Sequence, residues 1–169
     1  MDKHFELTNK FIINAFGVKL FQIKCTRRIK YAEVGDLGGY IEKEDNLSGD
    51  AWVSGDAQVS GDAWVSGDAQ VYGNAQVYGN AQVYGNARVS GDARVSNNNE
   101  HCGFDCFGSV NRHTHAYKTQ SGKVEITCGC FRGSIEEFDR QVKKTHQGNK
   151  FERQYMAIAE VIKIKFGLK

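Results

Sequence analysis

The most regular feature of the chain is a six-residue pattern of turn-forming, small and apolar positions over residues 49–96. Each copy reads Gly-Asp/Asn-Ala-x-Val-Ser/Tyr, and eight copies follow one another without interruption. Ala and Val lie two positions apart, so on an extended segment both face one side while residue x faces the other. The Gly-Asp or Gly-Asn pair is typical of a turn. The pattern therefore predicts eight very short strands separated by corners.

Such strands are stable only when they stack. An α-helix does not explain the pattern, because six residues turn a helix through about 600° and spread the valines around it. Stacked coils pair the backbone and bury continuous columns of Ala and Val. We therefore predict a parallel β-helix about three coils tall, roughly 15 Å at strand spacing. With eighteen residues in each coil, the predicted columns are Leu47, Val65 and Val83; Val53, Val71 and Val89; and Ile41, Val59, Val77 and Val95.

With this repeat the chain resembles the hexapeptide-repeat left-handed β-helix proteins, in which three six-residue sides form one triangular coil. The resemblance rests on the apolar residue at every sixth position and the small residue four positions later, as in Val53 and Ala57. Ser or Tyr after the valine departs from the family pattern. Left-handed coiling is implied by the resemblance alone. The best-known enzymes of this fold, acyltransferases and γ-type carbonic anhydrases, carry catalytic or zinc-binding histidines on or beside the coils.

The pattern changes on both sides of the repeats and divides the chain into three segments. Residues 1–48 predict an N-terminal β cap, with Gly38-Gly39 as a turn before the repeats. Residues 97–169 predict a small α+β module with a hairpin turn at Ser121-Gly122. In that module, Ser134 begins a capping-box pattern for one helix, and apolar positions from Phe151 to Phe166 predict a second. The expected fold is mainly β: a short left-handed parallel β-helix (49–96) between this cap and this module.

Composition and charge narrow the classes of function. The chain has 19 glycines and no proline, but eight of these glycines recur at a strict six-residue period, which excludes a flexible linker. The net charge is only +2, so we do not expect nucleic acid as the partner. Without a long apolar run or a signal-like N-terminus, we expect neither membrane insertion nor secretion. Five cysteines, an odd number, and no signal-like N-terminus indicate free thiols in a reducing cytosol.

Large aromatic side chains stand on the outward positions of the repeats. Exposed aromatics favour coverage by another subunit, and flat-sided prisms associate readily around a threefold axis. We therefore expect a homotrimer. The predicted oligomer interface consists of Trp52, Trp64, Tyr72, Tyr78 and Tyr84.

Catalysis on the coils is not indicated. All five histidines lie outside residues 49–96, and no loop interrupts the repeats to build an acceptor site. We expect no cofactor and no catalytic residue. A structural zinc site is the alternative, with thiolate ligands from Cys102, Cys106, Cys128 and Cys130, although Cys-x-Cys is a poor spacing for a zinc knuckle. A nucleophilic Cys130 with His146 as its base is a further alternative.

The remaining expectation concerns a ligand. The sequences LGGYIEKEDNLS before the repeats and GCFRGSIEEF after them resemble uncharacterised phage and prophage proteins, and small phage proteins often act against host defence. Anionic ligands require Arg side chains, backbone N–H groups and a stacking ring. We therefore predict a non-enzymatic protein that sequesters an anionic nucleotide signal; the alternatives are an inhibitor of a host defence protein complex and an acyltransferase-like enzyme. The predicted ligand-binding residues are Arg112, His113, His115 and Tyr117, with Phe131 and Arg132 before a helix N-terminus.

Overall fold

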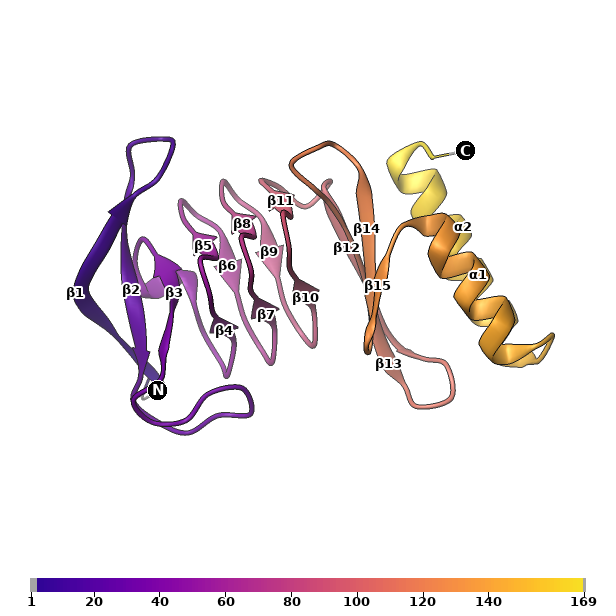
Figure 1. The fold of residues 1–169 in the computed structure, drawn as a ribbon, viewed down its shortest axis with the longest axis horizontal. Coiled ribbons are helices and arrows are strands. Elements are labelled where there is room, and N and C mark those ends of the chain that lie inside the picture. Colours follow the sequence, from indigo (N-terminus) through magenta and orange to yellow (C-terminus); the bar gives the residue numbers. More distant parts are fainter. Residues whose placement is uncertain (1–2, 169) are drawn as a thin grey trace. The chain divides into compact units, whose positions relative to one another are not determined.

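The computed structural model describes residues 3–168 of the chain. The chain divides into two compact units, residues 1–98 and 99–169. The first unit contains a β-solenoid of short stacked strands, and the second contains an antiparallel sheet and two helices (Figure 1). The prediction of a mainly β fold with a β-solenoid of about three coils is confirmed.

Each six-residue repeat forms one two-residue strand, as the pattern predicts. Residue x and the valine form the strand, and the glycine and its neighbours form the corner. The strands are β4 (Trp52–Val53), β5 (Gln58–Val59), β6 (Trp64–Val65), β7 (Gln70–Val71), β8 (Gln76–Val77), β9 (Gln82–Val83), β10 (Arg88–Val89) and β11 (Arg94–Val95).

The register of the strands confirms the predicted columns. Parallel pairing joins residues eighteen positions apart, such as Val53 with Val71 and Val65 with Val83. A bridge from Leu47 to Val65 extends one column downward. Each coil also donates backbone N–H groups to the next coil, for example from Trp52 to the carbonyl of Ala69 at 2.9 Å. The handedness of the coils stays a prediction.

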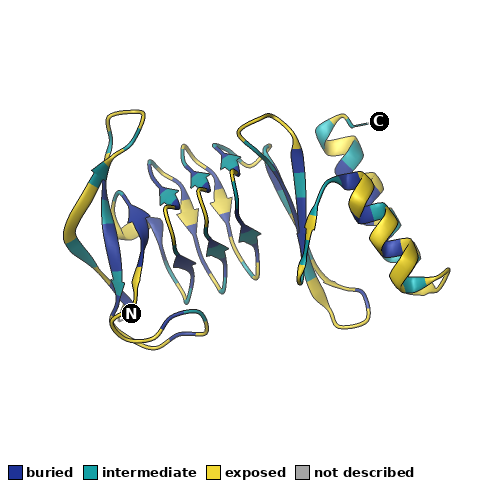
Figure 2. Cartoon of the chain, viewed as in Figure 1, coloured by how far each residue is buried: buried dark blue, intermediate teal, exposed yellow. Residues whose placement is uncertain are grey.

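The interior of the solenoid consists of the repeated Ala and Val side chains. Each of these residues is at most 2% exposed, and Figure 2 shows the buried positions recurring from coil to coil. At the corners, glycine is required by both conformation and space. Gly49 has φ +65°, and a Cβ placed there would lie 2.9 Å from the backbone nitrogen of Gly67 in the next coil. The coils can therefore stack this closely only if the first corner position has no side chain.

Three strands precede the coils. The hairpin β1–β2 is antiparallel, β2 pairs with β3, and β3 pairs in parallel with β5 of the solenoid. The resulting sheet has the order β1-β2-β3-β5-β8-β11 and continues one side of the solenoid beyond its first coil. These elements are β1 (Phe5–Ile13), β2 (Lys19–Cys25), β3 (Leu37–Ile41) and the short 3₁₀ helix η1 (Glu44–Asn46).

The turn predicted at Gly38-Gly39 is wrong, because both glycines lie inside β3. A Cβ on Gly38 would lie 2.5 Å from Ile23 Cγ1 and 2.6 Å from the carbonyl oxygen of Val53. A Cβ on Gly39 would lie 2.7 Å from the carbonyl oxygen of Ala57. The two glycines allow a strand to pass close to its neighbours, a requirement that the local sequence does not reveal.

The second unit contains a larger sheet than the predicted hairpin. Its four strands form an antiparallel meander in the order β12-β13-β14-β15. Sequence reasoning missed the first strand because it contains no β-branched residue, although Cys102 and Phe104 alternate onto one face and pack against the core. The strands are β12 (His101–Phe107), β13 (Arg112–Lys118), β14 (Val124–Cys128) and β15 (Phe131–Gly133).

Both predicted helices are present: α1 (Ile135–His146) and α2 (Lys150–Phe166). They lie side by side along one face of this sheet (Figure 1). The helix α1 begins with the predicted capping box, in which the Ser134 hydroxyl accepts from the Glu137 N–H and the Glu137 carboxylate accepts from the Ser134 N–H. The buried face of α2 includes Tyr155 and Ile158, so its predicted apolar face is confirmed.

Candidate functional site

A cavity of about 480 Å³ lies in the second unit, where the ends of β13, β14 and β15 meet the two helices. Its wall combines aromatic rings, two thiols and cationic groups, and none of its lining residues is Asp or Glu. The lining residues are Arg112, Cys128, Cys130, Phe131, Arg132, Phe138, Gln141, Val142, Thr145, His146 and Tyr155.

Aromatic rings form the apolar side of the cavity. Phe138 and Tyr155 are nearly buried, and their rings meet edge to face with centroids 5.9 Å apart. Phe131 packs against Phe138 at 5.4 Å, and the His146 ring stacks on Tyr155 at 5.4 Å with an interplanar angle of 27°. A flat ligand would therefore meet ring surfaces on this side.

The Tyr155 hydroxyl remains neutral at physiological pH. Burial raises the pKa of Tyr155 to about 12, and the neighbouring Cys128 acts in the same direction while Arg112 opposes it. The Cys128 thiol lies 3.9 Å from the hydroxyl oxygen, and the hydroxyl donates to the Phe107 carbonyl at 3.5 Å. The cavity thus presents a neutral phenol beside its cationic groups.

Arg112 lies across the turn between β14 and β15. The turn residue Gly129 has φ +61°, and a Cβ on it would lie 2.8 Å from Arg112 Nη1. Any larger residue at this position would displace the guanidinium. Within residues 3–168, no Asp or Glu forms an ion pair with Arg112, and the side chain is exposed. This arginine is consequently available to an anion that enters the cavity.

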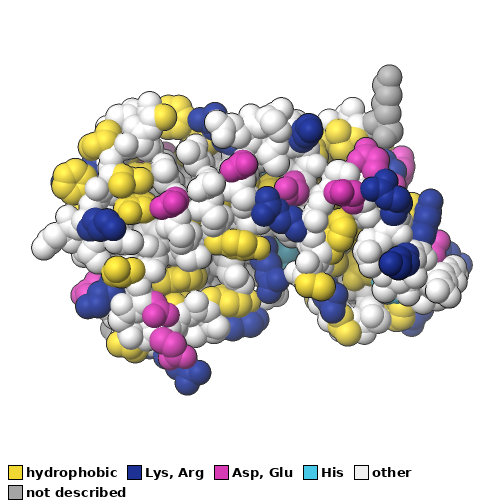
Figure 3. Space-filling model, viewed as in Figure 1, with side chains coloured by type: hydrophobic (Ala, Val, Ile, Leu, Met, Phe, Trp, Pro, Cys, Tyr) yellow, Lys and Arg dark blue, Asp and Glu magenta, His cyan; other side chains and the backbone are white. Residues whose placement is uncertain are grey.

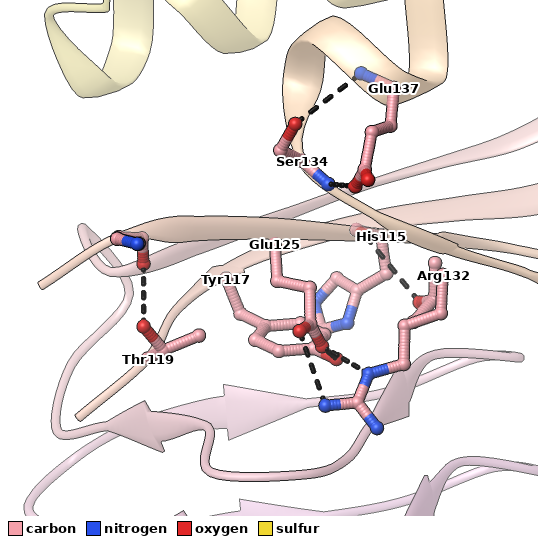
Figure 4. Close-up of polar contacts among 9 residues, drawn as sticks. His115, Tyr117, Thr119, Glu125, Arg132, Ser134 and Glu137 are labelled. Atoms are coloured by element: carbon pink, nitrogen blue, oxygen red, sulfur yellow. Dashed lines mark hydrogen bonds and ion pairs between the residues drawn. The ribbon is translucent and has the colours of Figure 1, made fainter. Parts of the chain in front are cut away.

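The second predicted arginine is engaged within the protein. Arg132 donates from Nε to Glu125 Oε1 at 2.6 Å and from Nη2 to Oε2 at 3.1 Å (Figure 4). The same carboxylate accepts a 2.6 Å hydrogen bond from the hydroxyl of Tyr117. A ligand would have to compete with this bidentate pair, so Arg132 contributes mainly to the shape of the rim.

The structure does not gather the six predicted ligand-binding residues into one site. Arg112, Phe131 and Arg132 line the cavity. His115 and Tyr117 are at most 1% exposed, and strand alternation places them with His113 on the sheet face opposite the helices. The predicted set therefore combined residues of β13 whose side chains lie on opposite faces of the sheet: Arg112 on one face, and His113, His115 and Tyr117 on the other.

On that opposite face the histidines bond to one another and to an acid. His101 Nδ1 lies 3.0 Å from His115 Nε2, and His113 Nδ1 lies 2.6 Å from Asp105 Oδ1. Burial lowers the pKa of His101 to about 4, and the nearby Lys165 charge acts in the same direction. His101 is therefore neutral at pH 7.

The cysteines predicted as an alternative zinc site do not form a ligand group. Among the described residues, no group of three or more His, Cys, Asp or Glu side chains is arranged to hold a metal ion. Cys102 and Cys128 pack in the core beneath the helices, whereas Cys106 and Cys130 are exposed. Burial raises the pKa of the Cys102 thiol to about 11, which disfavours the thiolate that zinc requires.

The helix N-terminus predicted to attract an anion already has carboxylates of its own. Glu137 accepts from the Ser134 N–H at 2.8 Å, and Glu136 accepts from the Ser134 hydroxyl at 2.7 Å. Figure 4 shows the Ser134–Glu137 pair closing the first turn of α1. These charges would repel a second anion, so they disfavour the start of α1 as an anion site.

Eight cavity residues were outside the predicted set of ligand contacts, and six of them belong to the helices: Phe138, Gln141, Val142, Thr145, His146 and Tyr155. They lie on or beside the buried stripes of α1 and α2, which the apolar periodicity located. Their convergence depends on how the helices pack on the sheet, and only the structure shows it.

The outward aromatics of the solenoid differ in exposure. Trp52 is only 5% exposed because the chain's own His4 lies against it, with ring centroids 6.2 Å apart, so its predicted outward exposure is wrong. Tyr72 and Tyr78 are partly buried, and Tyr78 packs against Phe16 at 5.3 Å. Trp64 and Tyr84 remain exposed, at 43% and 61%.

Comparisons with known proteins support the architecture. The family model described as YdcK beta solenoid repeat matches residues 57–73, 69–82 and 81–97, less than half of the chain. The chain is a β-solenoid repeat protein. Searches among curated proteins and among solved structures returned no match. Over the described residues, no helix has the length and apolar character needed to cross a bilayer.

Proposed function

We propose that this protein binds a small anionic nucleotide in the cavity of its second unit, without catalysis. The observation that carries the proposal is the Arg112 guanidinium beside an aromatic wall, without an ion pair to any Asp or Glu of residues 3–168, in a cavity whose lining contains no carboxylate. A volume of about 480 Å³ is in the range of small-molecule sites. The phosphate would pair with Arg112 and His146, and the base would lie against Phe131 and Tyr155.

Charge supports a compact ligand over a polymer. Lys and Arg side chains on the face drawn in Figure 3 alternate with Asp and Glu, and they form no continuous basic surface there. Binding to nucleic acid normally requires a basic stripe that contacts successive phosphates. A single arginine in a cavity is instead suited to one phosphate group, to which its guanidinium can donate two parallel hydrogen bonds.

The biological setting follows from the phage-type resemblance of the sequence. We propose that the protein acts in the cytosol of a bacterial host and withholds a nucleotide signal from a defence system. Sequestration requires tight binding and no turnover. The alternative, inhibition of a host defence protein, would make the solenoid surface the binding site and leave the cavity without a nucleotide.

The first test changes the charge that the proposal depends on. Arg112→Ala should weaken nucleotide binding roughly ten- to hundredfold, because a hydrogen bond to a charged group contributes about 1.5–3 kcal/mol. Arg140→Ala is the matched control, since this exposed arginine on α1 lies outside the cavity. Titration calorimetry of both variants gives the dissociation constants. Equal affinities for wild type and Arg112→Ala would exclude the cavity as the site.

The ligand is found with a panel of cyclic nucleotides and ADP-ribose derivatives. The protein is incubated with each compound, separated from free compound and heat-denatured, and the released material is identified. Intact recovery of one compound supports sequestration, and a chemically altered compound would indicate an enzyme. If no compound is retained and a host protein co-purifies, the protein-inhibitor alternative replaces the proposal.

A further inference from the structure

Two cysteines of the second unit, Cys128 and Cys130, line the same cavity. Cys128 is the last residue of β14, and Cys130 stands in the turn before β15, with Gly129 between them. Cys128 pairs with Phe131 across this turn, so Gly129 and Cys130 form a two-residue hairpin loop. Both cysteines line the cavity, although Cys128 is buried and Cys130 is exposed.

The spacing allows these thiols to join. Residues two positions apart have Cα atoms at most about 7 Å apart, and a disulfide needs roughly 4.4–6.8 Å. The positive φ of +61° at Gly129 bends the backbone away from full extension and shortens this separation. Rotation of the Cys128 side chain would give up its 3.3 Å bond from the Thr114 hydroxyl and its contact with Tyr155.

We infer that Cys128 and Cys130 are a reversible dithiol site that reacts with small anionic disulfides. Cys130 loses its proton to solvent, and its thiolate attacks one sulfur of the disulfide. A mixed disulfide forms, and the other half leaves as a thiolate that takes a proton from water. Cys128 then loses its proton to solvent, and its thiolate attacks Cys130 Sγ and expels the second half as a thiolate that takes a proton from water. The protein loses two hydrogens, and one small disulfide becomes two thiols.

Arg112 gives this site its preference for an anion. Its guanidinium crosses the Cys128–Cys130 turn at Gly129, where even a Cβ would collide with it. A disulfide that carries carboxylates would be held beside Cys130 by this charge. The inference goes beyond the proposed nucleotide binding and does not depend on it, since the reaction needs only the two thiols and the cavity.

Trypsin separates the relevant cysteines for the test. Cleavage after Lys123 and Arg132 gives a peptide of residues 124–132 that contains only Cys128 and Cys130. Cleavage after Arg94 and Arg112 gives residues 95–112, which contain only Cys102 and Cys106. The second peptide is an internal control, because Cys106 is exposed but does not line the cavity.

The reduced protein is treated with oxidised glutathione, alkylated, digested and analysed by mass spectrometry. We expect the 124–132 peptide to lose the mass of two hydrogens, and the 95–112 peptide to form no internal disulfide. Cys128→Ser should instead trap glutathione on Cys130, and Cys130→Ser should abolish the reaction of this peptide. With both cysteines present, Arg112→Ala should react with oxidised glutathione several-fold more slowly than wild type. The uncharged disulfide of 2-mercaptoethanol is the reference reagent, and its rate should be the same for both proteins.

Two results would overturn the inference. One is a 124–132 peptide that stays fully reduced while Cys106 reacts. The other is a wild-type peptide that keeps glutathione on Cys130 beside a free Cys128, since the buried thiol would then be unable to complete the exchange. Nucleotide binding is measured separately on the reduced protein, so failure of either proposal is recognised without the other.

Discussion

At Gly39 the backbone of β3 passes so close to the first coil that a single methyl group would collide with it. The nearest atoms to a Cβ are the Ala57 carbonyl oxygen at 2.7 Å and Val53 Cγ1 at 2.8 Å. One belongs to the backbone and the other to a fully buried side chain, so neither can move away cheaply. This residue therefore controls how the N-terminal strands join the solenoid.

Gly39→Ala should lower the free energy of unfolding by about 1–3 kcal/mol, the usual cost of overpacking a core. Chemical denaturation of the first unit's transition measures this change. Asp56→Ala is the control, because its side chain is exposed at the corner between β4 and β5 and its loss should cost no more than about 0.5 kcal/mol. An alanine variant as stable as wild type would show that β3 shifts to accommodate the methyl group.

The same position shows what local sequence cannot reveal. Two adjacent glycines are a turn signal by themselves, and nothing in residues 37–41 indicates that another strand presses on them. By contrast, the Val53–Val71 and Val65–Val83 pairs follow directly from the six-residue period, because three repeats make one coil and equivalent residues of successive coils pair with one another. Periodic contacts were predictable from the sequence, and contacts between unlike segments were not.

For the helices α1 and α2, too, some features were predictable from the sequence and others were not. The capping box at Ser134 and the apolar stripes predict where each helix begins and which face it buries. The cavity depends on how the buried faces of α1 and α2 pack against β14 and β15. The periodicity of the sequence does not specify this packing. The predicted anion site at the start of α1 stays a prediction, and its weakness is chemical, because the carboxylates of Glu136 and Glu137 already bond to Ser134 there.

The cap of α1 gives a direct test at this scale. Ser134→Ala removes the hydroxyl that accepts from the Glu137 N–H at 3.3 Å, and it should destabilise the second unit by about 1 kcal/mol. Ser109→Ala, in the exposed loop between β12 and β13, is the matched control. Thermal unfolding followed by circular dichroism compares the two. Equal melting temperatures for both variants would mean that Glu136 and Glu137 hold the first turn without the hydroxyl.

At the scale of the whole molecule, the outward side chains of the solenoid are covered on some sides and exposed on one. Of the eight x positions in the repeats, only Trp64 and Gln82 are exposed, and they pair with each other on β6 and β9. Trp52 is covered by His4, and Tyr78 packs against Phe16. The N-terminal segment thus shields other outward aromatics and leaves the β6–β9 side bare, with Tyr84 exposed nearby in sequence. We propose that the homotrimer forms through this side.

Trp64→Asp should then convert the trimer to monomer at micromolar concentration, because a carboxylate buried at each of three equivalent interfaces would lack a partner. Sedimentation velocity measures the change. Val110→Asp is the control, since this valine is 60% exposed in the second unit and lies outside the proposed interface. Trp64 also donates a 2.8 Å hydrogen bond to the Ser48 hydroxyl, so Tyr84→Asp serves as an independent variant that leaves this bond intact. A trimer that survives both substitutions would place the interface elsewhere, and a monomeric wild type would reject the trimer itself.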